Sequence, residues 1–214
     1  LGGKDLTPNL DSLADKGIWF EQLYATGTRS VRGVEAIISG FPPTSKRSTV
    51  KLAETQQNFF TIANLLSKQN YHTSLLYGGA AHFDNMRRFF LNNGFHQVVE
   101  EKDFENPSFK NSWGVSDEDL FRKAHDHLSN MGDQPFFSMV FTTSNHKPFD
   151  IPPGKVEKRS GPDGPRDSAV AYADYALGKF LELARSSNYY ENTVFLIVSD
   201  HNSRVYGDQL IPVE

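Results

Sequence analysis

Residues 136–146 read FFSMVFTTSNH, an apolar run (Phe136–Thr142) that ends in polar side chains. Two other runs share this character, Thr73–Tyr77 (TSLLY) and Thr193–Ser199 (TVFLIVS). Continuous apolar runs of this length, rich in β-branched and aromatic residues, are typical of strands that are covered on both faces of a parallel sheet. The three runs therefore predict central strands of such a sheet.

Helical patterns separate the predicted strands. In one of them, Phe59, Ile62, Ala63 and Leu66 fall on a single face. In another, Ser116 with Asp119 three residues later predicts a capping box. The expected helices are Asn9–Lys16, Phe59–Gln69, Asp117–Asn130 and Ser168–Ala184. Strands that alternate with helices predict an α/β sandwich.

Two stretches predict loops, Gly40–Lys51 and the Pro/Gly-rich Pro148–Pro165. In open α/β sheets, ligands gather beyond the carboxyl ends of the strands. Two predicted strands lead directly into groups that can do chemistry, Ser144-Asn145-His146 and Asp200-His201-Asn202. We therefore expect the functional site at this end of the sheet.

Composition narrows the function classes. The chain has 214 residues, enough for about one domain, and a formal net charge of −4. Nucleic-acid binders are more often basic, so no nucleic-acid partner is expected. The absence of cysteine excludes disulfides, thiolate metal sites and cysteine nucleophiles. No apolar run reaches the roughly 18–20 residues that a transmembrane helix needs.

The pair Asp200-His201 directly follows an apolar run. A carboxylate and an imidazole at the rim of a sheet suit Zn²⁺ or Mn²⁺. The alternative interpretation is an aspartate that caps the next element beside a surface histidine.

The segment Thr26–Gly33 sets hydroxyls beside glycines, just before an expected helical start at Val34–Ile38. A hydroxyl at a helix N-terminus lies near unpaired N–H groups that favour a phosphate. It becomes a good nucleophile only when a metal or base lowers its pKa. The alternative is an ordinary N-cap in a flexible turn.

The remaining histidines differ in how much they indicate. His146 could contact a phosphate oxygen or protonate a leaving group, or it could be structural. The segment His82-Phe83-Asp84-Asn85 follows a strand and a Gly-Gly turn, and it offers groups for a polar head group. His125 and His127, at i and i+2, do not share a helix face and are interpreted as solvated. His72 and His96 show no pattern.

In their order along the chain, four segments resemble motifs of the alkaline phosphatase/sulfatase superfamily, specifically its lipoteichoic acid synthase and phosphoglycerol transferase branch. Leu6–Ala14 with Gly17–Phe20 resembles the "TPNLD-x-LA…G-x-x-F" element, and Gly27–Glu35 resembles the nucleophile segment. Asn145–Phe149 resembles "NH-x-PF", and Ser199–His201 resembles the C-terminal metal pair. The resemblance implies a three-layer α/β/α sandwich with a mostly parallel central sheet.

The resemblance also implies roles for single residues. The nucleophile, which also binds the metal, is Ser30 or Thr28, where the family usually has Thr. Asp200 and His201 match metal ligands for one divalent ion, Mn²⁺ or Zn²⁺, with Mg²⁺ possible. His146 matches the histidine that contacts the substrate phosphate. The substrate-binding candidates are His146, His82, Asp84 and Asn85, because the family's glycerol-phosphate Arg and Trp have no match here.

The family's first metal ligand is a Glu before the "TPNLD" element, a position that the given sequence does not include. Glu21 and Glu35 are poor substitutes, because neither follows an apolar strand. We therefore expect residues 1–214 to be a partial sulfatase-like catalytic domain that lacks the first metal-ligand strand and the C-terminal strands. The parent would be anchored in a bacterial cell membrane with this domain on the extracytoplasmic side.

The implied activity is a metal-dependent transfer of a phosphoglycerol-type head group from a phospholipid donor to a glycan or polyol hydroxyl, through a covalent Ser or Thr intermediate. Three alternatives remain. A sulfatase would need a "C/S-x-P-x-R" signature, whereas Ser30-Val31-Arg32 has no Pro in place. A phosphoethanolamine transferase or phosphodiesterase shares the metal chemistry. A non-catalytic module that binds lipid head groups is the third.

Overall fold

The computed structural model describes residues 5–41, 46–52 and 57–202. Its centre is a parallel sheet in the order β2-β1-β5, formed by β1 (His72–Tyr77), β2 (Gln97–Val99) and β5 (Phe136–Phe141). β5 pairs with β1 over its whole length, from Phe136 opposite His72 to Phe141 opposite Tyr77. Two of the three predicted strands are thus confirmed.

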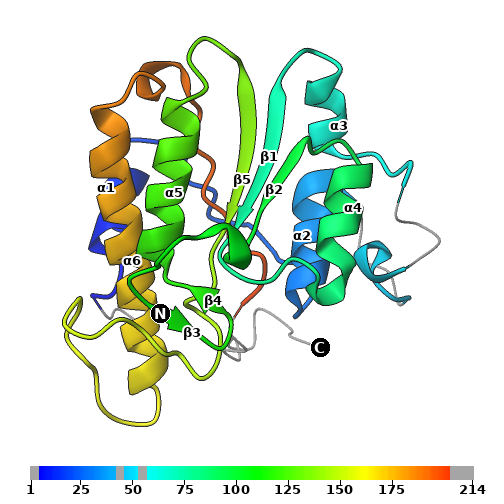
Figure 1. Cartoon of the computed structure of the whole chain (residues 1–214). Coiled ribbons are helices and arrows are strands. Elements are labelled where there is room, and N and C mark those ends of the chain that lie inside the picture. Colours follow the sequence, from blue (N-terminus) through cyan, green and yellow to red (C-terminus); the bar gives the residue numbers. More distant parts are fainter. Residues whose placement is uncertain (1–4, 42–45, 53–56, 203–214) are drawn as a thin grey trace.

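Alternate residues of the strands face opposite layers, as the strand period of two requires. Leu75 and Val98 belong to one core cluster, together with side chains of α2 and α4, whereas Leu76 and Val99 belong to a second, with side chains of α5 and α6. The helices are α1 (Pro8–Ala14), α2 (Ser30–Ser39), α3 (Ile62–Ser67), α4 (Met86–Asn92), α5 (Asp117–Ser129) and α6 (Gly164–Arg185). Figure 1 shows the two helical layers on either side of the sheet, which confirms the predicted sandwich.

Capping explains where the helices begin. The Thr61 hydroxyl accepts a hydrogen bond from the Asn64 amide and caps α3. The helix therefore begins at Ile62 rather than at the expected Phe59. The Ser116 hydroxyl accepts a hydrogen bond from the Asp119 amide and caps α5. The Asp119 carboxylate accepts a hydrogen bond from the Ser116 hydroxyl, whereas the Ser116 amide donates to the Phe109 carbonyl. Only the Ser116 half of the predicted capping box therefore forms. α6 begins at Gly164, earlier than expected, with a proline in its first turn.

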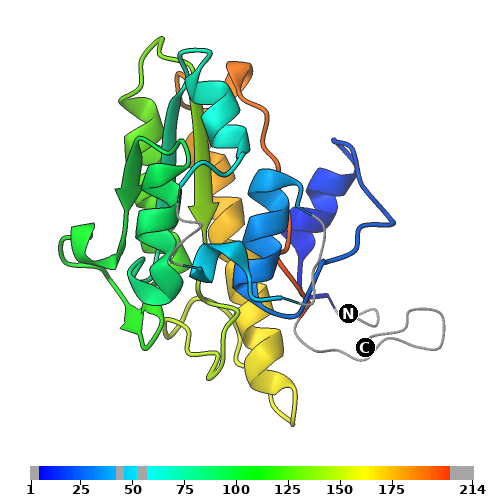
Figure 2. The same ribbon diagram turned by 90° about the vertical axis from the view of Figure 1, so that its right-hand side faces the viewer.

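Short elements complete the described chain. A two-stranded antiparallel hairpin, β3 (Lys110–Asn111) and β4 (Gly114–Val115), docks on the end of β1, where the Val115 amide donates to the Gly78 carbonyl over 2.9 Å. The 3-10 turns are η1 (Thr49–Lys51), η3 (Phe83–Asn85), η4 (Glu101–Asp103) and η5 (Tyr190–Asn192). Figures 1 and 2 place the hairpin at the end of the sheet to which the strands point.

The expected strand Thr193–Ser199 is wrong, because these residues run as coil and pair with no strand of the described sheet. Phe195 packs against the second core cluster, but Val194 and Leu196 are 94% and 73% exposed. Apolar composition alone does not make a strand, since the backbone also needs a hydrogen-bonded neighbour. No helix within the described residues is long and apolar enough to cross a membrane.

The interpretation of the helical histidines as solvated is also wrong. His125 Nδ1 lies 3.0 Å from the Tyr189 hydroxyl, and His127 Nε2 lies 3.0 Å from Ser74 Oγ. Burial lowers the pKa of His127, and the nearby His72 adds to this effect. His72 begins β1, so His72 and His127 lie at the end of the sheet opposite the one expected to hold the functional site.

Candidate active site

Residues 199–201 pass directly over the first turn of α2, and a glycine makes this approach possible. A Cβ built on Gly33 would lie 2.0 Å from the Asp200 carbonyl oxygen, which no side chain could tolerate. Gly33 therefore lets the backbone of Asp200 pack against α2. The consequence is that Asp200 and His201 lie beside the residue that begins this helix, Ser30.

Ser30 is in direct contact with His201. Its Oγ lies 3.3 Å from His201 Nε2, and the N-cap residue of α2 is Arg29, whose side chain makes no capping hydrogen bond. The helix begins at Ser30 rather than at the expected Val34, so the hydroxyl lies in the first helical turn, where unpaired amides face outward. Thr28 lies ahead of the helix and is exposed. Of the two candidate nucleophiles, the structure brings Ser30 to the histidine.

The His201 ring is oriented by its other nitrogen. Nδ1 lies 2.6 Å from the Asn202 carbonyl oxygen, and a carbonyl can only accept, so Nδ1 carries the hydrogen. Nε2 then presents a lone pair toward Ser30. The Asp200 Oδ2 atom lies 3.7 Å from this nitrogen, and Asp200 Oδ1 accepts the His201 amide over 2.9 Å. A hydroxyl, an imidazole lone pair and a carboxylate oxygen therefore lie close together.

These three donors suit part of a divalent-metal site. Zn²⁺ lies about 2.0–2.1 Å from N and O ligands in a tetrahedron, whose corners are then about 3.3 Å apart. The separations of 3.3 and 3.7 Å from His201 Nε2 to Ser30 and Asp200 match that spacing. Within the described part of the chain, no group of three or more His, Cys, Asp or Glu could hold a metal. Ser30, His201 and Asp200 thus offer donor atoms of the type and spacing that a divalent ion accepts, without completing a metal site among the described residues.

The two glutamates weighed as substitutes for a missing ligand have other surroundings. Glu35 is buried and accepts the hydroxyls of Ser48 and Thr49 over 2.6 and 2.8 Å. These bonds hold the chain after α2 against the helix. Glu21 is exposed in the loop after α1. Glu35 therefore has a structural role, because its carboxylate is hydrogen-bonded to Ser48 and Thr49.

Acidic side chains lie near the Tyr77 hydroxyl at this end of the sheet. Burial, the largest cause, and the charges of Asp84, Glu101 and Asp200 together raise the pKa of Tyr77, the last residue of β1, to about 12. Three carboxylates thus act on one hydroxyl beyond the strand. Ion pairs with Lys51 and Lys110 offset the charges of Asp84 and Glu101.

His146 lies in an exposed loop after β5, and a buried side chain of α5 holds the start of this loop. The buried carboxylate of Asp117, at the beginning of α5, accepts the amides of Thr143 and Ser144, each over 3.2 Å. Burial raises the pKa of Asp117, although hydrogen bonds from Ser144 and Thr143 oppose the shift. A fully buried carboxylate therefore supports the segment that presents His146.

The sequence analysis missed Trp113, which lies in the turn of the β3–β4 hairpin. Its ring centroid is 3.5 Å from that of His146, and its Nε1 donates to the Lys147 carbonyl over 2.6 Å. One indication of this contact was present in the sequence, the pair Gly78-Gly79, which was interpreted only as a turn. A Cβ on Gly79 would lie 2.6 Å from the Trp113 carbonyl oxygen, so the glycine admits the hairpin.

The other substrate-binding candidates lie beyond β1 and are not joined directly to Ser30. His82 and Asn85 are exposed, and Asp84 forms an ion pair with Lys51 at 2.7 Å. Asp84 and Asn85 both have positive φ, 55° and 59°, which fixes a tight bend after β1. The bend keeps these polar groups at the same end of the sheet as His146.

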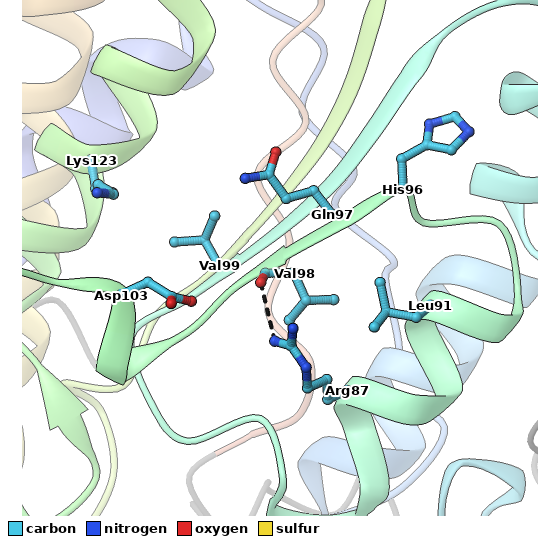
Figure 3. Close-up of a pocket in the computed structure, with 8 residues that line it drawn as sticks. All are labelled: Arg87, Leu91, His96, Gln97, Val98, Val99, Asp103 and Lys123. Atoms are coloured by element: carbon cyan, nitrogen blue, oxygen red, sulfur yellow. Dashed lines mark hydrogen bonds between the residues drawn. The ribbon is translucent and has the colours of Figure 1, made fainter.

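A cavity of about 410 Å³ lies along β2, away from this constellation. Figure 3 shows its lining: Arg87, Leu91, His96, Gln97, Val98, Val99, Asp103 and Lys123. Its Arg87 is already bonded to the Val98 carbonyl and to Glu100. The cavity shares no residue with the Ser30–His201 group, so it is not the site that the sequence indicates.

Comparison with known proteins identifies the family and supports the fold of the chain. The family model described as Sulfatase matches residues 1–212. The chain belongs to the sulfatase family. A crystal structure of an alkaline phosphatase superfamily protein from Vibrio parahaemolyticus is 54% identical, with a TM-score of 0.92 over 99% of this chain and 52% of that one. Both the expected superfamily and the expected fold class are confirmed.

Curated relatives of this sulfatase-family chain carry transferase and synthase names. Lipoteichoic acid synthase-like YvgJ from Bacillus subtilis (strain 168) is 25% identical over 209 residues, 94% of this chain and 34% of that protein. Phosphoglycerol transferase I from Xanthomonas axonopodis pv. citri (strain 306) is 27% identical over 213 residues, 92% of this chain and 30% of that protein. The chain thus spans about a third of the length of these relatives.

Proposed function

We propose that the protein is a metal-dependent transferase that moves a phosphoglycerol-type head group from a phospholipid to an acceptor hydroxyl on a glycan or polyol. The observation that carries the proposal is the contact of Ser30 Oγ with His201 Nε2 at 3.3 Å, beside Asp200. The names of the relatives, which include phosphoglycerol transferase I, support the group that is moved.

Ser30 is the nucleophile of this proposal. Its oxygen forms a bond to the phosphorus of the donor as the bond from phosphorus to the diacylglycerol oxygen breaks. The Ser30 proton leaves with diacylglycerol. In the second half, an acceptor hydroxyl attacks the phosphorus, its proton returns to Ser30, and the phosphoseryl bond breaks. Ser30 is thereby restored, and atoms and charge balance over the cycle.

Ser30, Asp200 and His201 would hold a divalent ion, Mn²⁺ or Zn²⁺ with Mg²⁺ also possible. When bound, such an ion lowers the pKa of a hydroxyl and polarises a phosphate oxygen. The Asn202 carbonyl keeps the His201 tautomer whose Nε2 is free for this purpose. The outward-facing amides of the first turn of α2 stabilise the negative phosphate oxygens.

His146 contacts the phosphate from the opposite loop. Its exposed position after β5 leaves the ring accessible to a ligand. A donor at this position stabilises the charge that develops on phosphate oxygens in the transition state. The proposal places the reaction at the extracytoplasmic face of a bacterial cell membrane, where a phospholipid donor and an envelope glycan are both accessible.

The test uses the full-length protein in detergent or membranes, with Mn²⁺ and head-group-labelled phosphatidylglycerol. Wild type and Thr28→Ala are expected to release diacylglycerol and move label to an acceptor or water, whereas Ser30→Ala is expected to do neither. Activity that survives in Ser30→Ala but not in Thr28→Ala would assign the nucleophile to Thr28. No release from any phospholipid with any of the three metals would contradict the transferase proposal and favour a head-group-binding module.

A further inference from the structure

The indole of Trp113 covers one face of the His146 ring. The two ring centroids are 3.5 Å apart, and the planes are inclined by 35°. The Lys147 carbonyl oxygen accepts from Trp113 Nε1 at 2.6 Å and lies 3.0 Å from His146 Nδ1. One carbonyl thus bonds to both rings and holds them in a fixed relation.

The hairpin that carries Trp113 is anchored without the indole. The Val115 amide donates to the Gly78 carbonyl, and the Trp113 amide donates to Asn111 Oδ1 over 2.8 Å. Asn111 Nδ2 donates to the Asp150 carbonyl over 3.1 Å, on the far side of His146 from β5. The backbone therefore positions residue 113 against the loop of His146 whatever side chain it carries.

The shared carbonyl also fixes the tautomer of His146. A carbonyl oxygen only accepts, so Nδ1 is the protonated nitrogen that faces it. Nε2 is then the nitrogen left to meet a ligand, and an imidazolium ring donates to the carbonyl with Nδ1 and to a phosphate oxygen with Nε2. Because the indole covers one face, the ring has little freedom to turn Nε2 away from the end of the sheet.

We propose that Trp113 is a positioning residue for His146, holding the imidazole so that Nε2 meets the phosphate of the substrate. The proposal rests on the proposed function in one respect, that His146 contacts phosphate. Phe83 meets the Trp113 ring edge-on, with centroids 6.2 Å apart at 86°. Trp113 thus also links His146 to the segment after β1 that holds His82 and Asp84.

A kinetic double-mutant cycle in the full-length protein separates positioning from structure. Because small misplacements of a catalytic group can cost about 10²-fold, Trp113→Leu is expected to lower kcat/KM roughly 10- to 100-fold. Trp113→Phe, which keeps an aromatic face, is expected to lose less than about 5-fold by the same reasoning. In a His146→Ala background, Trp113→Leu is expected to cost almost nothing more. Additive losses would overturn the proposal.

A second readout needs no turnover. The difference between wild-type and Trp113→Phe spectra isolates the fluorescence of Trp113. His146→Ala uncovers the indole face, so this emission is expected to shift to longer wavelength. Titration with sn-glycerol 1-phosphate is expected to change it in wild type only. If neither the His146→Ala substitution nor the titration with sn-glycerol 1-phosphate changes the Trp113 emission, the proposal is overturned. If wild type transfers nothing but both spectral effects appear, the positioning inference stands and the proposed transfer fails.

Discussion

The segments β5 and Thr193–Ser199 have nearly the same apolar composition, yet only β5 is a strand. β5 lies against β1 in complete register, and its side chains contact both core clusters. Thr193–Ser199 pairs with no described strand, and Val194 is 94% exposed. An apolar composition thus favours an extended backbone, but that backbone forms a strand only where a neighbouring strand pairs with it through hydrogen bonds.

A histidine follows each segment, His146 after β5 and His201 after Ser199, and the two are held in different ways. His146 lies in a loop supported by Asp117 and covered by Trp113. His201 is held by the close approach of the preceding residue's backbone, that of Asp200, to α2 at Gly33 and by the Asn202 carbonyl. In this account His201 binds the metal and His146 contacts the phosphate, so their removal should have unequal consequences.

The largest expected effect compares these two histidines. His201→Ala removes a metal ligand and the partner of Ser30, so transfer is expected to fall by at least about 10³-fold. His146→Ala removes one donor to the phosphate, for which about 10²-fold is expected. Initial rates on labelled phosphatidylglycerol measure both. Equal losses, or the reverse order, would contradict the division of roles.

The next effect sharpens the comparison at the backbone. Gly33→Ala sets a methyl group against the Asp200 carbonyl and should displace residues 200–201, lowering transfer by about 10²-fold. Gly17→Ala is the matched control, because its added methyl meets only the Leu13 carbonyl oxygen at 3.5 Å. Unchanged activity in Gly33→Ala would mean that the close approach does not position His201.

A stability experiment tests whether the two segments differ as their packing indicates. Met139 of β5 packs against the first core cluster, so Met139→Ala is expected to lower the free energy of unfolding by about 1–2 kcal/mol. Leu196 is 73% exposed, so Leu196→Ala is expected to change it by less than about 0.5 kcal/mol. Urea unfolding of the 214-residue chain measures both. Equal costs would show that residues 193–199 are packed as a strand.

The smallest effect concerns acid stability at the carboxyl end of β2. Burial of Glu100 favours its neutral form, but bonds from Lys102 and the Ala81 amide and the charge of Arg87 outweigh it, so the pKa is lowered. A lowered pKa in the folded state stabilises the fold above the unfolded-state pKa of about 4.3, and this is lost as the pH falls through the folded-state value. Glu100→Gln should therefore flatten the loss of stability in acid. The exposed Glu105→Gln should leave it unchanged.

Much of the fold could be predicted from the sequence. The runs at β1 and β5, the apolar face of residues 59–69 and the cap signal at Ser116 predicted the sandwich, because periodicity reports which faces are buried. The strand at 193–199 failed, since no pattern within a segment reveals whether a neighbour pairs with it. Likewise, the burial of His127 depends on Ser74 and His72, which lie far from it in the sequence.

The candidate site was predictable only where motifs carry it. Asp200, His201 and Ser30 were expected from their resemblance to family segments, and the fold brings them together. Trp113 could not be found this way, because its contact with His146 arises from the docking of a hairpin on Gly78 and Gly79. Close approaches of this kind depend on tertiary structure, although pairs of glycines do indicate where one can occur.

The central claim is that Ser30 is the nucleophile and that His201 and Asp200 activate it. The most direct measurement is peptide mass spectrometry of the full-length protein after brief incubation with phosphatidylglycerol and Mn²⁺, without acceptor. The account predicts a phosphoglycerol adduct on Ser30 that forms in Thr28→Ala and is absent from Ser30→Ala and His201→Ala. An adduct on Thr28, or turnover with no adduct on either residue, would contradict it.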